Sequence, residues 1–245
     1  MSIKCLNCHK ETINNFCSTC GQKTSTHKFS LQHFFVHDFV HGVLHVDKGL
    51  LFTIKELFTR PGHSIREYIQ GKRVNHYNYF AAIIIILTIT HFIEAYSNVH
   101  LSAIYGEGRL TGYIKIIQNY SKVIVLSGIP LFALVGYWVF KKVKQNYTEY
   151  LVLNMYLMVG VLLIRMTSPV LNMLFSHVAF LQIAKKTITI VEVVYCYWFY
   201  FQYFSAFGYG KKALISRSVL VAIIIWFTRG FISFVADEIG TAYFQ

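Results

Sequence analysis

Residues 79–97, YFAAIIIILTITHFIEAYS, are the stretch that decides the fold class. This run is close to the ~20 apolar residues that one α-helix needs to cross the hydrocarbon core of a bilayer. Four further runs of similar length follow, at about 121–140, 150–174, 187–209 and 214–235. Only 14% of the residues are charged, against about 25% in soluble domains. The sequence therefore predicts an all-α integral membrane protein, with about five transmembrane helices in a membrane domain over 79–245.

The positions of the basic residues predict the orientation of these helices. Cytosolic loops of membrane proteins carry an excess of Lys and Arg. A cytosolic N-terminus puts ten basic residues on the inner side, which are Arg60, Arg66, Lys72, Arg73, Lys141, Lys142, Lys144, Lys211, Lys212 and Arg217. It leaves five on the outer side, which are Arg109, Lys115, Lys122, Lys185 and Lys186. We therefore expect a multi-pass protein of the bacterial inner membrane, with its C-terminus outside.

The formal net charge of +12 raises the question of a nucleic-acid partner. The basic residues lie beside the apolar segments, where they would set the topology or touch anionic lipid. We therefore expect the bilayer to be their partner, and nucleic acid is not favoured.

Ahead of the membrane domain, residues 1–26 contain two closely spaced Cys-x2-Cys pairs, which are Cys5 with Cys8 and Cys17 with Cys20. Four thiolates at this spacing are typical of a structural Zn²⁺ site, which leaves no ligand position open for catalysis. A segment this short cannot bury a core of its own, so metal binding would supply its folding energy. Two disulfides, or iron in a rubredoxin-like site, are the alternatives. Reduced thiolates also favour a cytosolic location for this cysteine module.

Residues 28–78 form a basic, amphipathic connector between the cysteine module and the first span. Ser30 is a candidate N-cap for a helix over about 31–46. One flank of this helix carries four histidines at a spacing of four, and we call this set, with its acidic neighbour, the histidine stripe: His33, His37, His41, His45 and Asp38. The simplest interpretation is a helix lying on the inner leaflet. A second metal site and a pH sensor are the alternatives, because histidine is a transition-metal ligand that titrates near pH ~6.5.

The connector also carries a family resemblance. The cysteine pairs are followed by HGVLHVDKGLLFT at 41–53, KEL at 55–57, RPG at 60–62, IREYI at 65–69 and GKR at 71–73. This order resembles an uncharacterised membrane family, a domain of unknown function found mostly in Bacteroidetes. The resemblance covers about residues 5–75 and implies a zinc ribbon followed by several spans, with no activity attached. The family pattern has a proline shortly after Gly-Lys-Arg, where this chain has Asn75-His76-Tyr77-Asn78. The five-span arrangement is also similar to that of Yip1-type proteins.

Basic residues of the connector lie next to the first span. Pro61 disfavours helix at Arg60, so we expect one helical segment to end near Phe58 and a short one to run from about Ile65 to Gln70. Four side chains would then lie near lipid head groups: Arg60, Arg66, Lys72 and Arg73. They act as a topology anchor or bind a specific anionic lipid.

Five ionisable residues fall inside the predicted spans, where charge is costly. We call them the polar layer: His91, Glu94, Arg165, Glu192 and Arg229. In the predicted topology all five lie in the outer half of the bilayer. They form either an internal layer of ion pairs or the lining of a polar cavity.

No catalytic motif is evident in the chain. We therefore expect a scaffold, not an enzyme, that recruits a cytosolic protein partner through its zinc module. The first alternative is a small transporter or lipid-handling protein that uses the polar layer. The second is a metal-dependent membrane enzyme that uses the histidine stripe.

Overall fold

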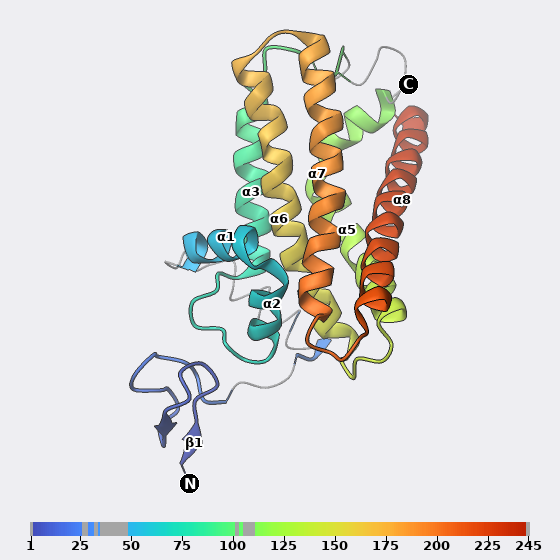
Figure 1. Cartoon of the computed structure of the whole chain (residues 1–245). Helices are drawn as coiled ribbons and strands as arrows, with labels where there is room; N and C mark the ends of the chain where they lie inside the picture. Colours follow the sequence, from blue (N-terminus) through green and yellow to red (C-terminus); the bar gives the residue numbers. More distant parts are fainter. Residues whose placement is uncertain are drawn as a thin grey trace.

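The computed structural model describes residues 2–25, 29–31, 34, 49–100, 103–104 and 111–243. In this part of the chain, a small two-stranded sheet precedes seven helices (Figure 1). The elements are β1 Ile3–Lys4, β2 Glu11–Thr12, α1 Gly49–Thr59, α2 Pro61–Ile69, α3 Tyr79–Glu94, α5 Thr111–Val139, α6 Tyr147–Leu174, α7 Val178–Phe204 and α8 Lys211–Tyr243. The prediction of a mainly helical chain is confirmed.

The five long helices run alternately up and down between the two ends of a bundle (Figure 1). The cysteine module, α1 and α2 lie at one end of this bundle, and the C-terminus lies at the other. Helix α6 begins with a capping box, in which Asn146 accepts from the Glu149 backbone and the Glu149 side chain accepts from the Asn146 backbone. The first half of α6, as far as Leu162, is almost entirely buried, so this helix forms the centre of the core.

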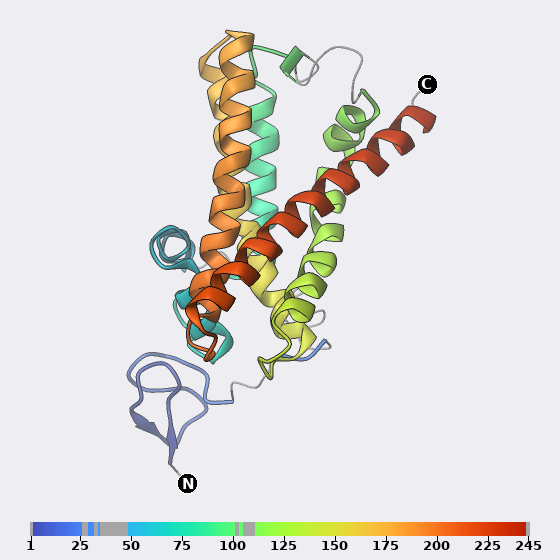
Figure 2. The same cartoon turned by 45° about the vertical axis from the view of Figure 1, so that its right-hand side comes forward.

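Helices α5 and α8 pack along each other and lean away from α3, α6 and α7, so that the bundle opens toward the C-terminal end (Figure 2). Helix α8 also contacts α7 near the loop that joins them. On the other side, Asn172 at the end of α6 exchanges side-chain hydrogen bonds of 2.9 and 3.0 Å with the Val99 backbone. This contact holds the segment after α3 against α6 and leaves the opening on the side of α5 and α8.

The prediction of five membrane-spanning helices requires correction. Among the described helices, two are both long enough and apolar enough to cross a membrane, Tyr147–Leu174 and Lys211–Ala242. Helix α3 has only 16 residues, and the apolar part of α5 is confined to Val123–Val139 because the helix is broken at Tyr120. Helix α7 is long enough, but it carries Lys185, Lys186 and Glu192, and many of its aromatic residues are tyrosines.

Proline and glycine explain how the connector turns at residues 60–62. Pro61 occupies the first position of α2, where its missing N–H removes no helical hydrogen bond. Helix α2 therefore begins four residues earlier than the expected start near Ile65. At Gly62, an added Cβ would lie 2.2 Å from the Tyr203 nitrogen and 2.3 Å from the Phe199 oxygen. Only glycine allows the two helix backbones to approach this closely.

Polar side chains fasten the connector to the bundle. The Arg66 guanidinium donates to the backbone oxygens of Gln202 and Tyr203 at 2.9 Å, which satisfies carbonyls at the C-terminal end of α7. The Tyr195 hydroxyl donates to the Leu57 carbonyl at 3.1 Å, and the Tyr156 hydroxyl donates to the Tyr77 carbonyl at 2.9 Å. Helices α1 and α2 are thus part of the folded body.

Candidate metal centre and polar cavity

The two Cys-x2-Cys segments fold as near copies of one turn. In each, the backbone carbonyl of the first cysteine accepts a hydrogen bond from the backbone N–H four residues later. The Cys5 carbonyl accepts from the His9 N–H at 2.9 Å, and the Cys17 carbonyl accepts from the Gly21 N–H at 2.8 Å. The residue after each pair adopts a left-handed conformation, with φ of 61° at His9 and 74° at Gly21. Strands β1 and β2 flank the first turn, and a bridge between Phe16 and Lys23 flanks the second.

These turns bring the four predicted ligands together. The sulfurs of Cys5 and Cys20 are 3.6 Å apart, those of Cys8 and Cys17 are 3.5 Å apart, and all four lie within 4.8 Å of one another. Metal–thiolate bonds of about 2.3 Å in a tetrahedron place the sulfurs roughly 3.8 Å apart. The four thiols are free, so the disulfide alternative is not what the structure contains. The geometry fits a metal ion held by four sulfurs.

Hydrogen bonds favour the thiolate form at two of the four cysteines, Cys17 and Cys20, whereas at Cys8 a hydrogen bond from the Lys10 backbone is outweighed by burial and the neighbouring thiols, which raise the pKa to about 11. Hydrogen bonds from the Thr19 and Cys20 backbones lower the pKa of Cys17 to about 6. The Asn7 side chain and then the Gln22 backbone lower the pKa of Cys20. Metal binding requires deprotonated thiols, so these amides favour the ligand form.

Gln22, which sequence reasoning did not select, attaches the cysteine module to the connector. Its side-chain oxygen accepts from the backbone N–H groups of Arg73 and Val74, both at 3.2 Å. At Gly71, which has a φ of 116°, an added Cβ would lie 2.6 Å from the Leu6 side chain. No local sequence pattern signals this role, because the contact joins segments about fifty residues apart.

The basic residues predicted to touch lipid head groups engage protein groups as well. Arg60 pairs with Glu56 at 2.7 Å and with Glu67 at 3.0 Å, and Lys72 lies 3.5 Å from Glu67. The Arg73 guanidinium lies 3.9 Å from the centre of the Phe29 ring. Together with the contacts of Arg66 on α7, these pairs give all four side chains a structural role. Contact with lipid stays a prediction for them.

The histidine stripe, His33, His37, His41, His45 and Asp38, lies outside the described residues. Phe34 is the described residue from the same segment that enters the core. It is buried, and its ring lies 5.8 Å from Tyr79 and 5.0 Å from Phe80. Its backbone N–H bonds to the Ser30 carbonyl at 2.9 Å, which is the helical pattern expected after an N-cap at Ser30.

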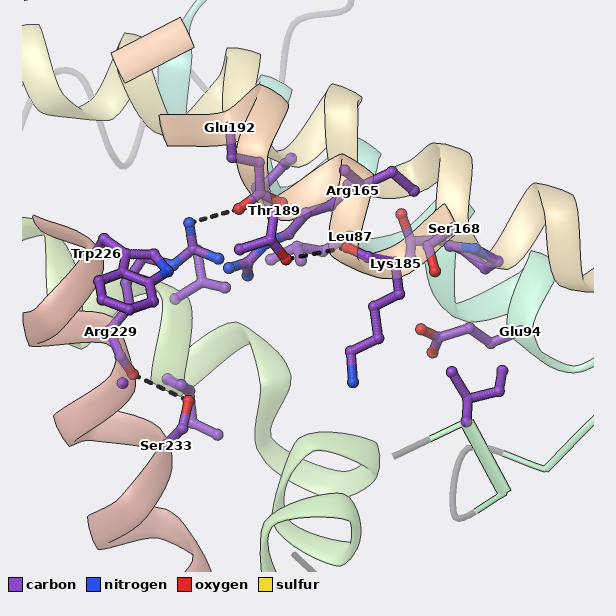
Figure 3. A pocket seen from close by; sticks show the side chains of 18 of the residues that line it. Leu87, Glu94, Arg165, Ser168, Lys185, Thr189, Glu192, Trp226, Arg229 and Ser233 are labelled. Atoms are coloured by element: carbon purple, nitrogen blue, oxygen red, sulfur yellow. Dashed lines mark hydrogen bonds and ion pairs between the residues drawn. The ribbon is translucent and has the colours of Figure 1, made fainter. Parts of the chain in front are cut away.

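The second candidate site lies where the bundle opens. Glu192 is only 2% exposed, and its two carboxylate oxygens accept from Arg165 Nε at 3.0 Å and Arg229 Nη1 at 2.5 Å. Figure 3 shows this group beside a cavity of about 680 Å³. The paired charges come from α6, α7 and α8, so one carboxylate links three helices. Sequence periodicity on a single helix gives no indication of this meeting.

All five residues of the polar layer line this one cavity, because His91 and Glu94 reach it from α3. Lys185, which was assigned to an outer loop, lies on α7 and extends its ammonium group into the same space as the Glu94 carboxylate (Figure 3). The two earlier alternatives, an ion-paired layer and an open polar cavity, therefore occur side by side.

Comparison with known proteins gives one partial match. A family model described as "Protein of unknown function (DUF3667)" matches residues 47–90, which are the C-terminal part of the connector and most of α3. No curated protein and no solved structure matches the chain. The connector is thus similar to a domain of unknown function, and the matched segment contains the docking elements α1 and α2. It also contains Asn78, whose side chain caps α3 by accepting from Phe80 and Ala81 where the family pattern suggested a proline.

Proposed function

We propose that this protein is a membrane-anchored scaffold, whose cysteine module binds one structural Zn²⁺ ion and recruits a protein partner on the cytosolic side. Four sulfurs in a closed set suit zinc and leave no coordination position for a substrate. The role proposed for the module is therefore recognition, and the bundle serves as its anchor.

The exposed surface of α8 supports the membrane location. This helix has 33 residues, roughly 50 Å at 1.5 Å per residue, which exceeds the ~30 Å hydrocarbon core. Only 22% of its most apolar window is buried inside the protein. Large apolar side chains on it that line no cavity are exposed, among them Val219, Leu220 and Ile223. Exposure of so much apolar surface to water is unfavourable, whereas contact of the same surface with lipid tails carries no such free-energy penalty.

We further propose that α3, α5 and α7 accompany α6 and α8 in the bilayer. Each lies antiparallel to its neighbour in sequence, and α3 and α7 pack against α6. The cysteine module and the basic connector would then lie together on the inner side, and the C-terminus would lie on the outer side. This placement keeps the reduced thiols in the reducing compartment.

The observation that carries the recruiting role is the position of the cysteine module. It protrudes from the end of the bundle, fixed through Gln22 (Figure 1). It exposes four large apolar side chains, Ile3, Leu6, Ile13 and Phe16, and Ile13 is 80% exposed. Exposed apolar side chains on a rigid module of this size are suited to anchor a protein partner.

Two measurements test the proposal. Elemental mass spectrometry of the detergent-purified protein should find one zinc per chain, and replacement of the four cysteines by serine should remove it. A second equivalent of metal would instead make the histidine stripe a metal site and favour the enzyme alternative.

A photo-crosslinking residue at Ile13 should give one adduct of defined mass in intact cells, absent in the four-serine variant. A crosslinker at Lys55 on α1 is the control, and equal labelling at both positions would contradict the recruiting role.

A further inference from the structure

Two lysine pairs that are about seventy residues apart in the sequence lie at the end of the bundle that carries the cysteine module (Figure 2). Lys141–Lys142 follow α5, and Lys211–Lys212 begin α8. An aromatic residue closely precedes each pair, and the rings of these two residues, Phe140 and Tyr209, pack edge to face with their centres 5.5 Å apart. Phe140 is fully buried and also stacks on Phe204, with the ring centres 3.7 Å apart. A contact between aromatic rings thus brings the two lysine-bearing segments together.

Polar contacts fix the same two segments. The Gln145 side-chain nitrogen donates to the Tyr203 hydroxyl at 2.7 Å. The Arg217 guanidinium donates to the Val139 carbonyl at the end of α5. We call the exposed surface that results the lysine surface, which consists of Lys141, Lys142, Lys144, Lys211 and Lys212. Sequence reasoning placed these residues on the inner side but gave no indication that they share one surface.

The lysine surface carries a positive charge that no ion pair with a described residue offsets. All five lysines are exposed, and none has an ion pair within the described part of the chain. Residues 140–148 and 204–217 contain no acidic residue, and Glu149 is buried where it caps α6. Residues 26–48, which lie mostly outside the described part, contain two acidic residues against two lysines. Even if both acidic side chains reached the lysine surface, three positive charges would remain.

The lysine surface lies at the level of the lipid head groups in the proposed membrane arrangement. The apolar part of α5 ends at Val139, and the candidate span in α8 begins at Lys211. The last turn of α5 exposes Trp138 and Tyr137 by 58% and 39%. Tryptophan and tyrosine gather at the membrane–water interface, because one part of each ring is apolar and another is polar. These aromatic residues and the lysines therefore mark the same depth.

We infer that the lysine surface binds the head group of an anionic phospholipid with two phosphates, one phosphate at each lysine pair. The positive-inside rule requires only an excess of basic residues on the inner side, whereas here two distant pairs are held together by a ring contact. Each lysine ammonium has three donors for phosphate oxygens. Once one phosphate is bound, the second lies close to the other pair, so its binding is effectively intramolecular. The inference rests on the proposal that the bundle lies in a bilayer, which supplies the lipid.

Native mass spectrometry of the detergent-purified protein tests the inference, because it counts bound lipids and compares their affinities. The probes are cardiolipin with two phosphates, phosphatidylglycerol with one, and phosphatidylcholine with no net charge, all with the same acyl chains. We expect one cardiolipin per chain, with half-saturation at a concentration about tenfold below that of phosphatidylglycerol. Phosphatidylcholine should bind most weakly. Equal half-saturation for cardiolipin and phosphatidylglycerol on the wild-type protein would overturn the inference, whether or not any variant folds.

Two double variants test whether both lysine pairs serve one head group. They are Lys141→Gln/Lys142→Gln and Lys211→Gln/Lys212→Gln. Each should raise the half-saturation concentration of cardiolipin about tenfold, to that of phosphatidylglycerol, because the remaining pair meets only one phosphate. Arginine in place of the same lysines keeps the charge and should keep the preference for cardiolipin. Retention of the full preference in either glutamine variant would contradict a shared site.

The matched control is Lys4→Gln/Lys10→Gln, which removes the same charge from exposed positions of the cysteine module. It should leave the preference for cardiolipin unchanged, and an equal loss in this control would show a general attraction of anions instead of a site. Inorganic pyrophosphate at tenfold excess should not displace the bound lipid. Displacement would mean that free phosphate groups are recognised, and it would overturn the assignment to a lipid.

Alkaline extraction of cell membranes keeps the two proposals distinguishable. Protein that stays in the membrane but binds cardiolipin and phosphatidylglycerol equally refutes the lipid site alone. Protein that is released refutes the membrane proposal and, with it, the lipid as the ligand.

Discussion

The side-chain oxygen of Gln22 lies 3.2 Å from the backbone nitrogen of Arg73 and accepts its hydrogen. A second bond of the same length comes from the Val74 nitrogen. Gln22 is only 4% exposed, so this contact is shielded from water. It joins the cysteine module to the turn that follows α2, and thereby fixes where the module lies relative to the bundle.

Gln22→Leu should release the module without loss of its metal. The variant leaves two backbone N–H groups without their acceptor, which costs about 1–3 kcal/mol when they are buried. We expect faster hydrogen exchange at residues 71–74 and faster proteolysis after residue 25, with zinc content unchanged. Thr24→Ala is the control, because Thr24 bonds within the module to the Asn14 and Asn15 carbonyls. Unchanged exchange at 71–74 would show that the contact does not hold the module in place.

The left-handed residues of the two cysteine turns should respond oppositely to substitution. Gly21→Ala puts a Cβ at a φ of 74° with no other atom within 4 Å, so its effect is purely conformational and costs about 1 kcal/mol. His9→Gly relieves the same strain at a φ of 61°. Because folding and metal binding are coupled, zinc affinity should fall about fivefold in the first variant and hold or rise in the second. Competition with a chelator measures both, and a loss for His9→Gly would contradict this account.

Gly62→Ala should disrupt the packing of α2 on α7. The added carbon would collide with backbone atoms of Tyr203 and Phe199, which cannot rotate away, so the variant should lose about 2 kcal/mol or more of stability. Gly210→Ala is the matched control, since no atom lies within 4 Å of its added Cβ. Thermal unfolding in detergent compares the two, and a similar midpoint for both would mean that α2 is not packed as described.

His76 should make the protein less stable in acid. It is hydrogen-bonded to Ser64 at 2.9 Å and packed against Tyr68 and Phe52. Burial, assisted by the positive charge of Arg60, lowers its pKa to about 4 from the usual 6.5. Between these two values the unfolded chain binds a proton that the folded chain does not, so stability falls as the pH drops from about 6.5 to 4, by about 3 kcal/mol in all.

The free energy of unfolding as a function of pH tests this expectation. His76→Gln should flatten the profile in that window, whereas His100→Gln, at an exposed position, should leave it unchanged. A profile that keeps its slope in His76→Gln would assign the acid sensitivity to another group.

Reporter fusions test the proposed passage of all five long helices through the bilayer. An enzyme that is active only outside the cytosol should be active after residues 100, 176 and 243, and inactive after residues 144 and 208. If only α6 and α8 crossed, the fusions after residues 176 and 208 would both be outside. The fusion at residue 208 therefore distinguishes the two arrangements.

Much of the local structure follows from the sequence because its causes are local. Apolar runs predicted the long helices, and α3 begins at Tyr79, the first residue of the first run. The cysteine spacing predicted a four-sulfur cluster, because a turn of four residues places two thiols on one side. By length and composition only two of the described helices qualify as spans where five were predicted, because α3 is short, α5 is broken, and α7 mixes charges and tyrosines into its apolar surface.

The tertiary structure decided the contacts between distant segments. Spacing along one helix could mark Arg165, Glu192 and Arg229 as costly charges, but only the packing of α6, α7 and α8 showed that they share one carboxylate beside a cavity. The same holds for Gln22 at the connector. The sequence by itself determined which segments are helical and which cysteines can share a metal, since both depend on neighbours along the chain. Which side chains meet across the bundle depends on how helices pack, and that is a property of the whole fold.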